Sequence, residues 1–105
     1  MRVLKIGVAK GDVHEVNIDG TLEELQTLVD GDIEPCAPVG IKEHHIELLA
    51  NGEGLLKGLT PNENLFPFFF VGNVVVVGVS GEDFDSLTDN QIEFIKLWLQ
   101  RLEMC

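Results

Sequence analysis

Four consecutive valines, Val74–Val77, restrict the fold of this chain more than any other segment of its 105 residues. An unbroken run of β-branched residues is typical of a strand buried on both faces, because a strand with one solvent face alternates apolar and polar residues. We therefore expect a strand over residues 73–79 at the centre of a sheet. A chain of this length has room for one core, so we expect a single domain over residues 1–105.

Alternating apolar residues and turn signals predict the other strands. Apolar side chains alternate over residues 4–8. After a turn at Lys10–Asp12, His14, Val16 and Ile18 lie on one face of a second strand. This pattern predicts an N-terminal hairpin. Residues 33–39 contain two prolines, which cannot donate to a central ladder, so we expect an irregular edge strand there. Residues 46–50 are expected to form another short strand.

Two helices are predicted from capping boxes, Thr21 with Glu24 and, after a linker over residues 80–87, Thr88 with Gln91. The second helix has a broad apolar face: Ile92, Phe94, Ile95, Leu97, Trp98, Leu99 and Leu102. This face is wider than packing on one sheet surface requires, so the helix either lies in a groove of its own domain or meets a partner with its rim. The expected fold class is α+β, an antiparallel sheet of about five strands with two helices packed on it.

The charge balance limits the classes of partner. Eighteen acidic residues against seven basic ones give a net charge of −11 at pH 7. This charge repels phosphate backbones, so we expect no direct binding to DNA or RNA. It attracts a basic protein surface, although it also serves solubility. The longest apolar run, residues 65–72, is too short to span a bilayer, and Met1–Lys5 resembles the start of a strand more than a signal peptide. We expect a cytoplasmic protein with reduced thiols and no membrane partner.

No catalytic, metal or cofactor signature is present in the sequence. His44 and His45 are adjacent, so on a strand they would point to opposite faces and could not share one metal ion. Cys36 lies between two prolines with no basic neighbour to lower its pKa, and Cys105 completes no ligand spacing. We therefore expect a non-enzymatic protein with no catalytic residues, no metal and no cofactor.

Residues 48–65 combine three glycines, a proline and three asparagines with apolar residues, which favours one defined loop shape. The glycine spacing does not match the G-x-G-x-x-G nucleotide fingerprint. Two interpretations remain: a small nest of backbone amides that binds an anion near Lys57, or a hairpin turn at Asn51–Gly52 followed by a structured crossover. If the loop binds a small ligand, the candidate residues are Asn51, Gly52, Gly54, Lys57, Asn62 and Asn64.

Residues 65–71 hold four of the six phenylalanines. A continuous apolar run cannot bury every side chain against one face of a strand, so some rings are exposed or are covered by a second protomer. Together with the wide face of the C-terminal helix, this pattern favours a homodimer. The candidate interface residues are Phe68, Phe69, Phe70, Phe94 and Trp98.

Three segments of the chain, residues 18–34, 51–62 and 81–92, occur in an order that resembles a family of small domains catalogued as domain of unknown function 3846. This family is known from bacteriophages, plasmids and their bacterial hosts. The resemblance implies a short accessory protein of a mobile element, located in the bacterial host cell, with no established activity or ligand. Members often carry a basic residue after the Pro-Asn of the loop. This chain has Glu63 there, which argues against a shared anion site.

Charge and resemblance together predict a protein that acts by stoichiometric binding in counter-defence. Its acidic surface would block the basic nucleic-acid groove of a host effector. An alternative is a small-ligand sponge, in which the loop sequesters a nucleotide-derived immune signal. A further alternative is a structural or host take-over interaction protein that presents Phe68–Phe70 or Trp98 to a partner that is not basic.

Overall fold

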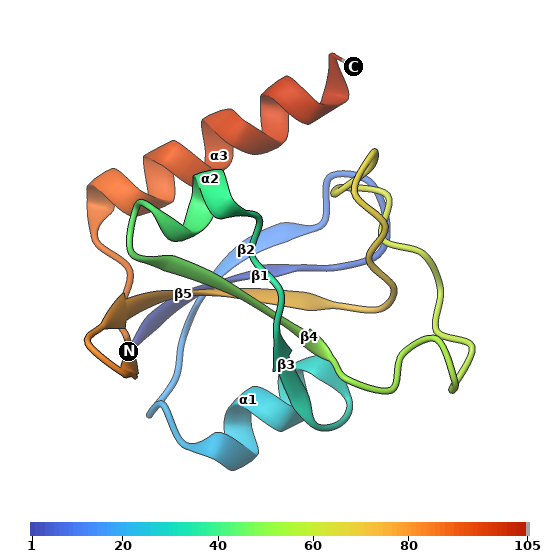
Figure 1. Cartoon of the computed structure of the whole chain (residues 1–105), viewed down its shortest axis with the longest axis horizontal. Coiled ribbons are helices and arrows are strands. Elements are labelled where there is room, and N and C mark those ends of the chain that lie inside the picture. Colours follow the sequence, from blue (N-terminus) through green and yellow to red (C-terminus); the bar gives the residue numbers. More distant parts are fainter. Residues whose placement is uncertain (105) are drawn as a thin grey trace.

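A six-stranded antiparallel sheet forms the centre of the computed structural model, which describes residues 1–104 (Figure 1). Its strands are β1 (Arg2–Ile6), β2 (Val13–Asn17), β3 (Ile33–Pro35), β4 (Ile46–Asn51), β5 (Val74–Ser80) and β6 (Asp83–Asp85). Five strands follow the order β2-β1-β5-β4-β3, and β6 pairs with the end of β5. The predicted N-terminal hairpin and the edge position of β3 are confirmed. Cys105, the second expected thiol, lies outside the described residues.

Helices cover both faces of the sheet, as Figure 1 shows. Helix α3 (Asp89–Glu103) and the short α2 (Val39–Lys42) lie on one face, and α1 (Leu22–Val29) lies on the other. Strand β5 separates the two cores: Val74 and Val76 pack toward α3, whereas Val75 and Val77 pack toward α1. All four valines have no exposed surface, which confirms the prediction of a central strand buried on both faces. The α+β class is likewise confirmed.

Two short elements differ from the sequence-based expectation. Residues 33–39 were expected to be one edge strand, but β3 ends at Pro35 and α2 begins at Val39. Pro38 precedes α2 with a φ of −59°, an angle that suits the start of a helical turn. The expected linker over residues 80–87 contains β6, which pairs with β5 through Val79 and Phe84. Elements of three or four residues are too short to show a period in the sequence.

Helix α3 packs against the sheet and also against residues of the neighbouring loops. Its residues Ile92, Ile95, Leu99 and Leu102 are buried in the core. Phe94 and Trp98 are half-buried at its rim. The ring of His44 stacks on Phe94 with a centroid distance of 3.9 Å, and the ring of Phe68 lies 5.7 Å from Trp98. Residues of the same chain thus cover part of the wide apolar face of α3. The sequence left open whether this face lies in a groove of the domain or meets a partner.

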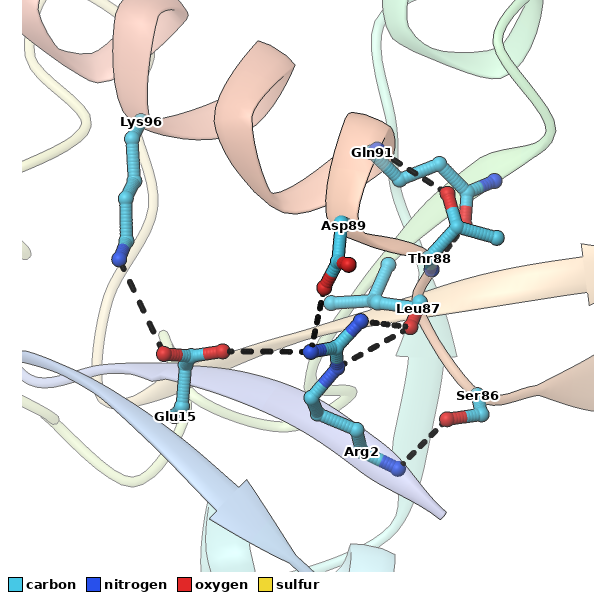
Figure 2. Close-up of polar contacts among 8 residues, drawn as sticks. All are labelled: Arg2, Glu15, Ser86, Leu87, Thr88, Asp89, Gln91 and Lys96. Carbon is cyan, nitrogen blue, oxygen red and sulfur yellow. Dashed lines mark hydrogen bonds and ion pairs between the residues drawn. The ribbon is translucent and has the colours of Figure 1, made fainter.

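The N-terminal end of α3 is tied to the sheet by Arg2 (Figure 2). The guanidinium group lies 2.8 Å from the carboxylate of Asp89 and donates twice to the carbonyl of Leu87, at 3.2 and 3.0 Å. Glu15 on β2 lies 3.9 Å from both Arg2 and Lys96. These contacts join β1, β2 and α3. Within residues 1–104, no helix combines the length and apolar character that crossing a membrane requires.

Candidate functional site

The chain between β4 and β5 forms a long loop, residues 52–73, at the end of the sheet where β4 finishes and β5 begins (Figure 1). The loop folds back on itself, because Asn62 donates its backbone amide to the carbonyl of Phe70 at 2.8 Å and Gly72 donates to Thr60 at 2.7 Å. Leu65, which has no exposed surface, anchors the loop in the core on the α3 side. The loop is therefore a structured connection between two neighbouring antiparallel strands. The hairpin turn and crossover expected after Asn51–Gly52 are not formed, because β4 pairs directly with β5.

Three buried asparagine side chains bind this loop to the rest of the fold. Each donates both hydrogens of its amide nitrogen to two backbone carbonyls, at distances between 2.8 and 3.1 Å. The acceptor pairs are Val29 and Asp30 for Asn51, Ile6 and Gly72 for Asn62, and Gly7 and Ala9 for Asn64. The loop is thereby attached to the end of α1, to β1 and to the β1–β2 turn. The structure gives all three candidate asparagines a structural role.

Backbone amides of the loop also have acceptors within the chain, which argues against the anion nest. The donors and their carbonyl acceptors are Gly52 to Asp32, Gly54 to Asn51, Lys57 to Glu53, Gly58 to Leu55 and Leu59 to Gly54. The amide of Glu53 donates to the side-chain oxygen of Asn51. A nest requires successive amides that point at the anion, and these amides already bind protein oxygens.

A cleft of about 430 Å³ opens between this loop and the β3–β4 edge of the sheet. Its lining residues are Glu34, Cys36, Ala50, Asn51, Gly52, Glu53, Gly54, Leu55, Leu56, Phe69, Phe70 and Val71. Gly54 is necessary to its shape, because a Cβ atom at this position would lie 2.6 Å from Cγ2 of Val71. Three of the six candidate ligand residues, Asn51, Gly52 and Gly54, lie in this lining. The side chain of Lys57 is directed to Gly31, at the end of α1.

Large apolar side chains stand exposed around the cleft. The exposed fraction is 69% for Leu55, 89% for Leu56 and 70% for Phe69, and Phe66 nearby in the loop is 68% exposed. Single exposed leucines are common on protein surfaces, but a group of this size usually marks an interaction site. Leu55 and Leu56 were not among the candidate residues, although an apolar pair among glycines and asparagines is the signal that the sequence offers.

Two carboxylates and a protonated thiol complete the lining. Glu34 and Glu53 are both exposed, and no lysine or arginine lines the cleft among the described residues. Burial, together with the negative charges of Glu47 and Glu34, raises the pKa of the Cys36 thiol to about 12. The thiol donates a hydrogen bond to the carbonyl of Leu48 at 3.3 Å. Cys36 therefore contributes a neutral, weakly reactive surface to the cleft.

The candidate interface residues fall into three places. Phe69 and Phe70 line the cleft, whereas Phe94 on α3 stacks on His44. Phe68 and Trp98 pair with each other, and Phe68 is 39% exposed. His44 and His45 belong to the turn before β4, where His45 has a φ of 58°, so the alternation of side chains along a strand does not apply to them.

Comparison with known proteins identifies the family of the chain and leaves its activity open. No curated protein and no solved structure matches it. One family model, described as Domain of unknown function (DUF3846), matches residues 1–102. That match covers nearly every residue, from β1 through almost all of α3, so the chain belongs to the family described as Domain of unknown function (DUF3846).

Proposed function

We propose that this chain is a non-enzymatic accessory protein of a phage or mobile element that acts by stoichiometric binding in counter-defence. Its acidic surface would occupy the basic nucleic-acid groove of a host effector in the cytoplasm of the bacterial cell. The observation that supports this proposal is the distribution of charge. Fifteen of the eighteen carboxylates are exposed, all except those of Asp12, Glu24 and Glu47.

The exposed carboxylates greatly outnumber the basic groups that could neutralise them. The chain has seven lysines and arginines, and Arg2 and Lys96 share one acidic partner, Glu15. The carboxylates are spread over the surface, for example Glu23 on α1, Asp83 on β6 and Glu93 on α3. A protein with this field attracts basic surfaces and accelerates association with them.

The lining of the cleft bears on the nucleotide alternative. A nucleotide that entered the cleft would place its phosphates near Glu34 and Glu53, with no basic side chain from the described lining residues. The uncompensated repulsion disfavours a nucleotide there. The exposed apolar group around the cleft instead favours a protein partner.

Phage infection offers a direct test of the proposed function. Bacterial cells that carry defined DNA- or RNA-cleaving defence systems are infected with a phage that each system restricts, with and without expression of this chain. We expect the chain to restore plaque formation against at least one system. The purified chain should bind the corresponding effector at one-to-one stoichiometry, and binding should weaken as salt is added because salt screens exposed charges.

A charge-neutralised variant provides the control. Glu82→Gln, Asp83→Asn and Asp85→Asn remove three exposed charges around β6. The variant should associate with the effector more slowly than the wild type and depend less on salt. Absence of rescue from every system tested, or binding that is insensitive to salt, would contradict the proposal.

A further inference from the structure

The apolar side chains around the cleft are held in exposed positions by a hydrogen-bonded loop. Leu55 and Leu56 follow a turn in which Gly54 packs against Val71, and Phe69 precedes the segment that pairs with residues 60–62. The anchors of the loop, Leu65 and the three asparagines, are all buried. A loop fixed in this way keeps its apolar groups ordered before binding, which reduces the entropy lost on association.

The cleft has two chemically distinct sides. Leu55, Leu56 and Phe69 come from the loop, whereas Glu34 comes from the edge strand β3. The carboxylate of Glu34 lies along Gly52, since its Oε2 atom is 3.6 Å from the position that a Cβ atom of Gly52 would take. Glu53 follows directly and is exposed. An apolar wall therefore faces an acidic rim.

We propose that this cleft docks a segment of the partner protein in which an aromatic or aliphatic side chain is flanked by lysine or arginine. The inference rests on the proposed function, because it identifies where a basic partner is held. The apolar side chain would fill the cleft against Leu55, Leu56 and Phe69, and the basic side chains would pair with Glu34 and Glu53. A volume of about 430 Å³ accommodates one large side chain and parts of its neighbours.

Charge complementarity distinguishes this occupant from a second copy of the chain. Two copies would each carry a net charge of −11 and would bring the carboxylates of both rims close together. A basic segment neutralises the same rim. The exposed leucines and Phe69 provide the hydrophobic contribution that charge alone does not supply, and buried apolar anchors contribute most of the free energy at protein interfaces.

Short synthetic peptides test the cleft directly. The probes are an Arg-Phe-Arg peptide, an Arg-Ser-Arg peptide that lacks the apolar side chain, and a Glu-Phe-Glu peptide that reverses the charge, each with the same Gly-Ser flanks. Each is titrated into the isotope-labelled full chain, and amide chemical shifts are recorded by NMR. We expect only the Arg-Phe-Arg peptide to bind, with shifts confined to Gly52–Leu56, Phe69–Val71 and Glu34.

Surface variants with matched controls separate the two contributions. Leu56→Ser should weaken peptide binding about tenfold, because one leucine contact is lost. Glu34→Gln with Glu53→Gln should weaken it about threefold per charge, within the range measured for exposed ion pairs. The controls are Val39→Ser on α2, which is 73% exposed, and Asp19→Asn, an exposed carboxylate before α1. Both lie outside the cleft lining and should bind as the wild type does.

Several outcomes would overturn the inference. Equal binding of the Arg-Ser-Arg peptide, equal binding of the Glu-Phe-Glu peptide, or no binding of any peptide would each contradict the docking cleft. So would a concentration-dependent dimer that Leu56→Ser abolishes. Phage rescue tests the proposed function independently of the cleft. If Leu56→Ser rescues phage growth as well as the wild type does, the cleft fails while the proposed function stands.

Discussion

The side chain of Asn62 connects two parts of its own loop to strand β1, which is far away in the sequence. Its amide nitrogen donates to the carbonyl of Ile6 at 3.1 Å and to that of Gly72 at 2.9 Å, and its oxygen accepts from the backbone amide of Asn64 at 3.0 Å. The residue is 3% exposed, so water does not readily replace these partners. Loss of such a group leaves buried backbone atoms without partners.

We predict that Asn62→Ala lowers the free energy of unfolding by about 2–3 kcal/mol, because two buried carbonyls and one amide lose their partner. Urea denaturation monitored by circular dichroism measures the change. Asn17→Ala, at an exposed position on β2, is the matched control and should stay within about 0.5 kcal/mol of the wild type. Equal stability of the two variants would show that Asn62 does not hold the loop.

Cys36 illustrates a second effect of burial on a single residue. Burial raises the pKa of its thiol to about 12 from an ordinary value of 9.0, so the native thiol stays protonated when the unfolded one ionises. The unfolded state then binds fewer protons than the native state between these two values. The contribution of Cys36 to stability is therefore complete below about pH 9 and declines as the pH rises toward 12.

We predict slow alkylation of Cys36 in a Cys105→Ser variant, in which it is the sole cysteine. At pH 8 the thiolate fraction of Cys36 is about a thousandfold lower in the native state than in the unfolded state. A more basic thiolate is also more nucleophilic, which raises the native rate again by about thirtyfold. Iodoacetamide should thus react about thirtyfold more slowly with native than with urea-unfolded protein. As the pH is raised above 9, this variant should lose more stability than one with Cys36→Ser added. Similar rates in both states would contradict the raised pKa.

The start of helix α3 shows how a local sequence signal and tertiary contacts reinforce each other. Thr88 accepts a hydrogen bond from the backbone amide of Gln91 at 3.1 Å, and the side chain of Gln91 accepts one from the backbone amide of Thr88 at 3.0 Å. Gln91 also donates to the carbonyls of His44 and His45, and so joins α3 to the turn before β4. Figure 2 shows Arg2 beside this cap.

We predict that Thr88→Ala lowers the free energy of unfolding by about 1 kcal/mol, because the first turn of α3 loses its side-chain acceptor. Thr88→Ser retains the hydroxyl and should be close to the wild type. Thr60→Ala, at an exposed loop position, controls for loss of a threonine. Denaturant unfolding and amide hydrogen exchange in the first turn of α3 measure the effect. If Thr88→Ser is as damaging as Thr88→Ala, the methyl group and not the cap is responsible.

Across the protein, the net charge of −11 acts on stability as well as on binding. The molecule measures 32 × 31 × 23 Å, which is comparable to the Debye length of about 30 Å at 0.01 M salt. At low salt, therefore, most carboxylates repel one another through the entire structure. Unfolding separates these charges, so the repulsion favours the unfolded state.

We predict that the melting temperature rises by several degrees between about 0.01 M and about 0.15 M sodium chloride, where the Debye length falls to about 8 Å. Differential scanning calorimetry measures the rise. The variant with Glu82→Gln, Asp83→Asn and Asp85→Asn should melt at a higher temperature in low salt and show a smaller rise. A melting temperature that does not respond to salt would mean that the surface charges do not destabilise the fold.

The sequence predicted the elements that have a local signature. The valines of β5, the alternation in β1 and β2, and the two capping boxes each encode their structure within a few neighbouring residues. Helix α2 and strand β6 were missed because they have no period of their own. Strand β6 forms because it pairs with β5, and no pattern within residues 83–85 predicts this pairing.

The same division applies to the candidate site. The sequence alone identified the loop, its asparagines and its phenylalanines, because glycine, proline and asparagine restrict the backbone locally. Only the tertiary structure decided that the asparagines face inward to backbone carbonyls, whereas Leu55, Leu56 and Phe69 face outward. It also placed Glu34, from β3, beside the loop. The direction of each side chain depends on hydrogen bonds and packing between segments up to 57 residues apart, which local chain sterics do not encode.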